Sequence, residues 1–206
     1  MVEIHLEQTP LAHHHLHSNS EIESDNSKEA IMISECPTHT QLAIRGELSE
    51  KKFALIVKKV IGIALPQNPC TASTNSKGDR ILWMGPDEWL IILQGADKLH
   101  LKYELGNSLK NTFSAVIDVS NSRSILRITG AKSRETLMKG CSIDLHPRSF
   151  KVNSVVNTWL AQARIALHKI SESNYSESYD IYVHRSFADY LWIWLQDAVK
   201  EYSTKI

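Results

Sequence analysis

Three residues that could support nucleophilic catalysis lie close together in one segment of the sequence. Cys141, Asp144 and His146 fall between Lys139 and Pro147, and a thiolate activated by a neighbouring imidazole is a common enzyme nucleophile. A working pair needs its base within hydrogen-bonding reach, which adjacency in sequence does not supply. The proline also restricts the direction of the loop. We therefore favour a structural cysteine in the turn after a helix, and we assign no catalytic residue.

A run of histidines near the start of the chain could bind a divalent metal. His13, His14, His15 and His17 are neutral imidazole ligands at ordinary pH. They belong to the polar, acidic segment 1–29, where we expect an arm or linker and no fixed geometry around the imidazoles. Weak adventitious binding is the favoured interpretation, and we assign no metal site.

Other polar residues have plain structural explanations. Asp118 ends an expected strand and could act on a ligand, but we favour a turn residue whose carboxylate binds the backbone of residues 120–122. The acidic segment 85–89 has the composition of a hairpin turn. Arg185 and Asp189 are expected to support the start of a helix.

Composition and missing motifs exclude several functions. The formal net charge is zero, which disfavours a nucleic-acid surface. A glycine-rich phosphate loop, a C-x-x-C pair and a strand followed by G-x-G-x-x-G are all missing, so we expect no nucleotide, flavin or dinucleotide cofactor in this chain. Three unevenly spaced cysteines, and the lack of an export signal or a membrane-spanning segment, lead us to expect a cytoplasmic protein.

The elements that would position these residues occur twice. Residues 31–46 align without gaps with residues 115–130, and each copy has a strand, a polar turn, an alternating strand and a final glycine. We therefore divide the chain into the arm 1–29, a first half at 30–112 and a second half at 113–206.

Each half continues with a short amphipathic helix, a hairpin and a closing helix. Ser49 is the expected N-cap of the first short helix. The expected segments are helices near 53–60 and 132–138, hairpins at 80–93 and 159–183 with a polar loop at 171–178, and closing helices at 97–109 and 186–202. The pattern ββαββα, repeated twice, predicts an α+β fold of ferredoxin-like character with antiparallel sheets and helices on one side.

The last helix carries the strongest pattern. Ser186 and Asp189 form a predicted capping box. A stripe at three- and four-residue spacing is expected to face the core; it contains Phe187, Tyr190, Leu191, Trp194, Leu195, Ala198 and Tyr202. Trp192 and Ile193 fall outside this stripe, which suggests a second buried surface. Together with Arg148, they are our candidates for a subunit interface.

Four ordered blocks of the sequence resemble a known family. They are Trp83–Leu90, Asp118–Ser120 with Leu126–Gly130, Lys139–Phe150 and Arg185–Trp192. Together they look like the signature blocks of the sarcosine oxidase γ-subunit family, which is related to the aminomethyltransferase fold of the glycine-cleavage T-protein. The duplicated halves of that fold agree with the repeat in this sequence.

The resemblance implies a non-catalytic γ subunit that supports the assembly of a heterotetrameric oxidoreductase. Partner α, β and δ subunits would hold FAD, FMN, NAD and tetrahydrofolate, with α as the main contact, and the complex would demethylate sarcosine to glycine with oxygen. The segment Lys139–Cys141 lacks the continuation found in folate-dependent relatives, so no catalytic or cofactor-binding residue is carried over. The alternative is a stand-alone folate-binding protein of one-carbon transfer that uses Asp118.

Overall fold

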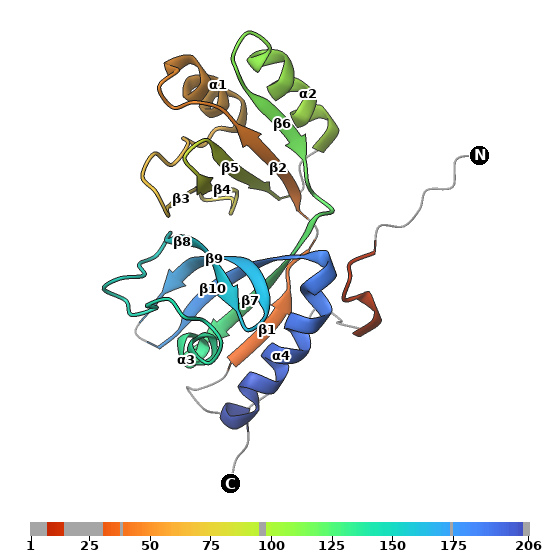
Figure 1. Ribbon diagram of the computed structural model, residues 1–206, viewed down its shortest axis with the longest axis vertical. Coiled ribbons are helices and arrows are strands. Elements are labelled where there is room, and N and C mark those ends of the chain that lie inside the picture. Colours follow the sequence, from red (N-terminus) through yellow and green to blue (C-terminus); the bar gives the residue numbers. More distant parts are fainter. Residues whose placement is uncertain (1–7, 15–30, 38, 95–97, 174, 204–206) are drawn as a thin grey trace, which may run out of the picture.

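The computed structural model describes residues 8–14, 31–37, 39–94, 98–173 and 175–203. Within these residues the strands form two five-stranded antiparallel sheets (Figure 1). The first sheet consists, in spatial order, of β1 (Ile31–Glu35), β7 (Arg123–Gly130), β10 (Glu177–His184), β9 (Ala163–Glu172) and β8 (Val155–Leu160). The second consists of β3 (Ala72–Thr74), β4 (Arg80–Gly85), β5 (Glu88–Leu93), β2 (Thr40–Arg45) and β6 (Ala115–Asp118).

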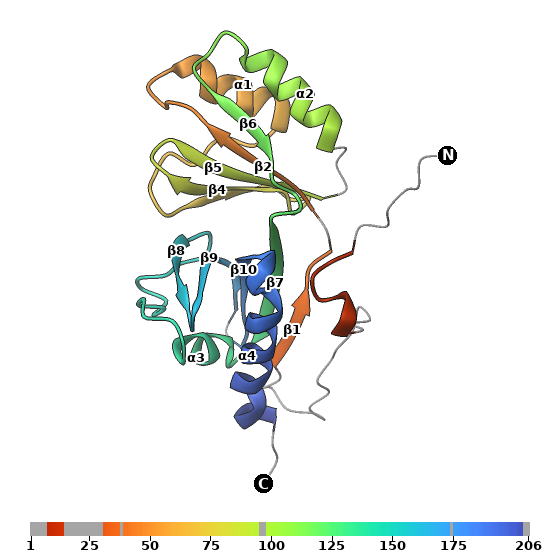
Figure 2. The same cartoon turned by 45° about the vertical axis from the view of Figure 1, so that its right-hand side comes forward.

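The sheets stack face to face, and helices cover their outer sides (Figure 2). Helices α1 (Lys51–Ile61) and α2 (Lys98–Leu109) cover the β2-containing sheet, and α3 (Ser133–Met138) and α4 (Arg185–Ser203) cover the other. A third hydrophobic cluster fills the layer between the sheets; it contains Leu82, Leu90, Ile92, Ile125, Val155, Ala166 and Tyr182. The expected α+β fold of duplicated halves with antiparallel sheets is thus confirmed.

Each half contains one strand more than the sequence pattern suggested. The order of elements is ββαβββα in both halves, because β3 and β8 precede the two hairpins. The run from Trp159 to Ile170, expected to be a single strand, is divided by a turn at Ala161 and Gln162. Ala161 adopts a φ of 50°, a left-handed conformation that sequences usually signal with glycine or asparagine. Because the sequence lacks that signal, it predicts one continuous strand at this position.

The two halves exchange their first strands. β1 pairs with β7 in the sheet of the second half, whereas β6 pairs with β2 in the sheet of the first half. The expected division between residues 112 and 113 therefore does not separate the two sheets. Two crossing segments, one after β1 and one after β6, connect them (Figure 1).

The boundaries of two helices differ from the expected ones. Helix α1 has Glu50 at its N-cap without a side-chain hydrogen bond, and Ser49 instead donates to Glu47. The helix ends at Gly62, whose φ of 80° allows its N–H to bond the carbonyl of Lys58. Helix α4 begins at Arg185, so the capping box expected one residue later is not formed.

The buried face of α4 is narrower than the expected stripe and is turned from it. Its fully buried residues are Ala188, Leu191, Trp192, Leu195 and Val199. Trp192 is 1% exposed, whereas Phe187 and Tyr190, which we expected in the core, are 45% and 37% exposed.

Residues 8–14 explain the burial of Trp192. This N-terminal segment includes the 3₁₀ turn η1 (Ala12–His14) and lies beside α4 (Figure 2). Leu11 is fully buried in the same cluster as Trp192, and the His14 ring lies 6.3 Å from the Trp192 ring. Part of the expected arm is therefore packed on the body. No helix among the described residues is long and apolar enough to cross a membrane.

Candidate functional site

The inner layer between the sheets contains a buried ion cluster centred on Asp180. Arg127, its neighbour across β7 and β10, donates from Nε to Oδ1 at 2.7 Å and from Nη2 to Oδ2 at 3.0 Å. Arg80, from β4 of the other sheet, places Nη2 2.7 Å from Oδ2, off the direction of a hydrogen bond, so this contact is an ion pair. The cluster therefore links the two sheets by charge.

Burial shifts the titration of the groups around this cluster. His168 faces Asp180 across β9 and β10, is fully buried, and has no hydrogen-bond partner for either ring nitrogen among the described residues. Loss of solvent lowers the pKa of His168 to about 4 and raises the pKa of Cys36 to about 11. The imidazole and the thiol are therefore both neutral at pH 7, and the thiol is a poor nucleophile.

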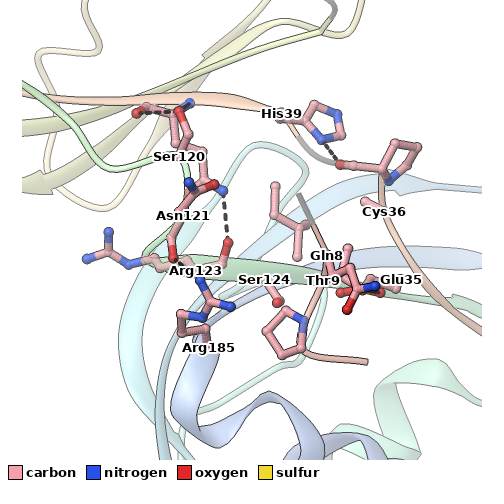
Figure 3. A pocket seen from close by; sticks show the side chains of 14 residues that line it. Gln8, Thr9, Glu35, Cys36, His39, Ser120, Asn121, Arg123, Ser124 and Arg185 are labelled. Atoms are coloured by element: carbon pink, nitrogen blue, oxygen red, sulfur yellow. Dashed lines mark hydrogen bonds between the residues drawn. The ribbon is translucent and has the colours of Figure 1, made fainter. Parts of the chain in front are cut away.

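A polar pocket lies where the two crossing segments meet the N-terminal segment (Figure 3). The Thr9 hydroxyl donates to Glu35 Oε2 at 2.8 Å, while Glu35 Oε1 and Gln41 Oε1 are buried without a partner among the described residues. Burial raises the pKa of the Glu35 carboxyl and lowers that of His39. Arg185 reaches in from the start of α4 and donates to the Asn121 carbonyl at 3.4 Å. Many of these polar groups bond one another and stabilise the junction.

Asp118 has the structural role that we favoured. Its Oδ1 accepts hydrogen bonds from the Ser120 backbone N–H at 2.9 Å and from the Ser120 hydroxyl at 2.6 Å. Ser120 Oγ in turn accepts from the Gln41 N–H at 3.0 Å. The carboxylate therefore holds the crossing segment after β6 against β2.

The segment around Cys141 makes structural contacts. Cys141 is buried in the core cluster, and its N–H bonds the carbonyl of Leu137 at the end of α3. The Asp144 carboxylate accepts from the His146 N–H at 2.9 Å and from the Ser149 hydroxyl at 2.5 Å. These two bonds close a loop, and they lower the pKa of Asp144. The structural interpretation of Cys141 is supported.

The histidine run is arranged differently from the expectation. Nε2 of His13 and of His14 lie 3.0 Å and 2.6 Å from Oδ1 of Asp189, so Asp189, which we expected to support the start of the helix, contacts the N-terminal segment. His15 and His17 lie outside the described residues. The chain thus brings two imidazoles and a carboxylate together from positions about 175 residues apart.

The three interface candidates divide into two groups. Trp192 is buried inside the chain by its own N-terminal segment, so it is not available to a partner in this form. Ile193 is 53% exposed and Arg148 is exposed, and both stay predictions. The expected second surface of α4 exists, but this chain itself covers the part that contains Trp192.

The sequence alone did not predict the ion cluster around Asp180. Its only local signal is a charge inside an alternating apolar strand, with Asp180 two positions before Tyr182 and His168 two positions after Ala166. Side chains two residues apart share a face of a strand. Asp180 should therefore share a face with Tyr182, and His168 should share a face with Ala166, both in the layer between the sheets. Nothing in the sequence identifies Arg80 of the other sheet as the partner of Asp180.

The stacked arrangement of duplicated halves is that of an aminomethyltransferase fold. The structure superposes on the glycine cleavage system aminomethyltransferase T from Bartonella henselae with a TM-score of 0.60 and 11% identity, over 85% of this chain and 47% of that one. At this identity the likeness concerns the fold alone.

Closer relatives define the family. The model of the sarcosine oxidase, gamma subunit family matches residues 45–201. The chain is 33% identical over 176 residues to the sarcosine oxidase subunit gamma of Corynebacterium sp. strain P-1, covering 85% of this chain and 83% of the relative, and 30% identical over 198 residues to that of strain U-96. This chain belongs to the sarcosine oxidase gamma subunit family.

A solved structure extends the agreement to almost the full length. A chain of the heterotetrameric sarcosine oxidase from Corynebacterium sp. U-96, in complex with pyrrole 2-carboxylate, superposes with a TM-score of 0.85 and 29% identity. The match covers 98% of this chain and 99% of that one.

Proposed function

We propose that this chain is the γ subunit of a heterotetrameric sarcosine oxidase and serves its assembly and stability rather than its chemistry. The observation that carries the proposal is the full-length likeness to a chain of such an enzyme, together with family membership. In the assembled oxidoreductase, α, β and δ subunits hold FAD, FMN, NAD and tetrahydrofolate. The complex demethylates sarcosine to glycine with oxygen in the cytoplasm.

The packing between the sheets supports a role without a cofactor in this chain. The inner layer is filled by the apolar cluster that includes Leu82 and Tyr182, and by the ion pairs of Asp180. These side chains contact one another across the two sheets, so this layer serves as a core. Ligand sites usually combine an open apolar cavity with a few directed polar groups.

An exposed apolar row on α4 is the surface that we assign to a partner, with α as the main contact. Phe187, Tyr190 and Ile193 recur at three-residue spacing and are each more than one-third exposed. Large apolar side chains grouped on one exposed face are typical of interaction sites. Arg148 is the charged residue that we expect at the same or a neighbouring contact.

Co-expression with the α, β and δ chains tests this assignment. Ile193→Arg should reduce the amount of α that co-purifies by at least about tenfold, because a buried charge without a partner is costly. Tyr103→Arg is the matched control, and this variant should retain full recovery. Tyr103 is 71% exposed on α2, a helix that lies on the opposite side of the stacked sheets from α4 (Figure 1). A flavin spectrum is expected only when the partner chains are present.

Two results would contradict the proposed role. One is a wild-type chain that behaves as a monodisperse monomer and gains no thermal stability when α is added. The other is equal recovery of α with both arginine variants, which would remove the α4 row from the interface while leaving the subunit role to be judged by the first result.

The alternative is an independent folate-binding protein, for which the aminomethyltransferase-like fold is the supporting observation. Asp118 would then bind the ligand, although its carboxylate already holds Ser120. Calorimetry with tetrahydrofolate separates the two functions. Micromolar binding that is lost in Asp118→Ala would favour the alternative, and no heat of binding would favour the assembly subunit.

A further inference from the structure

The N-terminal segment and helix α4 bring three metal-ligating side chains to one point. The ligand atoms of His13, His14 and Asp189 all lie within 4.8 Å of one another. Both imidazoles direct Nε2 at the same carboxylate oxygen, at 3.0 Å and 2.6 Å.

The two distances from Asp189 to the imidazole nitrogens are close to those between neighbouring ligands of a bound metal ion. Zinc binds imidazole nitrogen and carboxylate oxygen at about 2.0–2.2 Å. Two ligands at that distance and at tetrahedral or octahedral angles are about 3.0–3.5 Å apart. The His13 contact already has this spacing, and the His14 contact needs to open by less than about 1 Å.

The backbone that carries the two histidines is fastened to the body. Leu11 is fully buried in the core, and the turn is closed by the His14 N–H bonding the Leu11 carbonyl at 2.9 Å. The hydrogen bond from Thr9 to Glu35 adds an anchor on β1. The sequence led us to expect only adventitious binding because a polar arm would not fix the geometry of the imidazoles. In the structure these contacts do fix that geometry.

His14 lies next to the buried ring of Trp192, which fixes one side of the site. The two ring centroids are 6.3 Å apart with an interplanar angle of 43°. The His14 side chain is 24% exposed, compared with 60% for His13 and 50% for Asp189. One ligand is therefore held against the core, while the other two face solvent from which an ion can enter.

We propose that His13, His14 and Asp189 form a binding site for a late first-row divalent cation, best represented by Zn²⁺, that ties the N-terminal segment to helix α4. Two imidazoles and one carboxylate favour Zn²⁺, Ni²⁺ or Co²⁺ over Mg²⁺, which prefers oxygen ligands and retains its water. Three protein ligands leave at least one position for water or for a further residue. Binding adds a cross-link between the two ends of the chain and stabilises the folded state by mass action.

Titration of the metal-free full-length chain with Zn²⁺, followed by calorimetry, tests the site. We expect one ion per chain, and an affinity at least about tenfold lower in Asp189→Asn and in His14→Ala. Asp197→Asn is the matched control, because Asp197 is exposed on the same helix and pairs with Lys200; its affinity should equal that of the wild type. Mg²⁺ should give no heat.

A second measurement distinguishes this site from binding by the histidine run alone. Ni²⁺ bound beside His14 should quench the fluorescence of Trp192, and the quenching should disappear in Trp192→Phe and in Asp189→Asn. Two results would overturn the proposal. One is an unchanged zinc affinity in Asp189→Asn. The other is a zinc affinity that is lost in the double variant His15→Ala and His17→Ala but kept in the variants of the proposed ligands. Thermal melts without metal check that each variant is folded.

Discussion

Replacing Asp180 by asparagine removes the negative charge that links the two sheets. The side chain is fully buried and holds Arg80, itself 4% exposed, and Arg127, 35% exposed. With charge centres about 4 Å apart and an effective dielectric constant of about 20, each attraction is worth about 4 kcal/mol. The variant leaves the buried guanidinium of Arg80 without a counter-ion, while Arg127 can turn towards water.

The loss should be about 3–5 kcal/mol of unfolding free energy, the range found when one member of a buried ion pair is removed. Urea denaturation of the full chain, followed by circular dichroism, measures it. Asp87→Asn is the matched control, because Asp87 pairs with Arg45 at 2.8 Å with both side chains more than half exposed. A surface pair of this kind should cost at most about 1 kcal/mol.

A compensated variant separates the cost of an orphaned charge from a general loss of packing. In the double variant Arg80→Met and Asp180→Leu, both buried charges are replaced by apolar side chains, and stability should return to within about 1–2 kcal/mol of the wild type. The reasoning is refuted if Asp180→Asn costs no more than Asp87→Asn, or if the double variant is less stable than Asp180→Asn alone.

Three further outcomes follow from other buried contacts. The pKa of His168 is lowered to about 4, so the unfolded chain binds a proton near pH 6.5, whereas the folded chain binds it only near pH 4. The free energy of unfolding should therefore fall by about 3 kcal/mol as the pH drops through this window, and His168 should contribute no pH dependence above it. Denaturation of His168→Leu at several pH values should show a shallower fall. Gly140→Ala should cost about 1–3 kcal/mol in the same assay, because its Cβ would lie 2.6 Å from the Trp194 ring and 3.0 Å from a backbone nitrogen. Leu11→Ala should release the N-terminal segment and shift tryptophan emission to longer wavelength, because Trp192 gains solvent; unchanged emission would contradict the covering role of residues 8–14.

The features that the sequence predicted well are local. The hairpin at residues 80–93 has a proline turn between two apolar strands, and the structure places β4 and β5 there. The second copy of the repeat has a polar turn between its first strand and its alternating strand, and the carboxylate of Asp118 closes that turn as expected. Turn chemistry and strand alternation act over a few residues, so they can be read directly from the sequence.

The features that it missed depend on distant segments. Trp192 packs with Leu11 and His14 from the other end of the chain, whereas the periodicity of α4 alone placed it outside the core stripe, on a second buried surface that we expected to meet a partner. The pairing of Asp180 with Arg80 requires the two sheets to be stacked. The division of β8 from β9 depends on a left-handed residue at Ala161, whose N–H bonds the Gly140 carbonyl.

The exchange of strands joins the two duplicated halves into one folding unit. β1 and β6 each lie at the edge of the sheet that belongs mainly to the other half. A cut between residues 112 and 113 would strip β6 from β2 and β1 from β7, and would leave each fragment with an unpaired strand and an open sheet edge. The cut would also part Arg80 from Asp180. Repeated halves that could each have formed a small domain are therefore joined into one body.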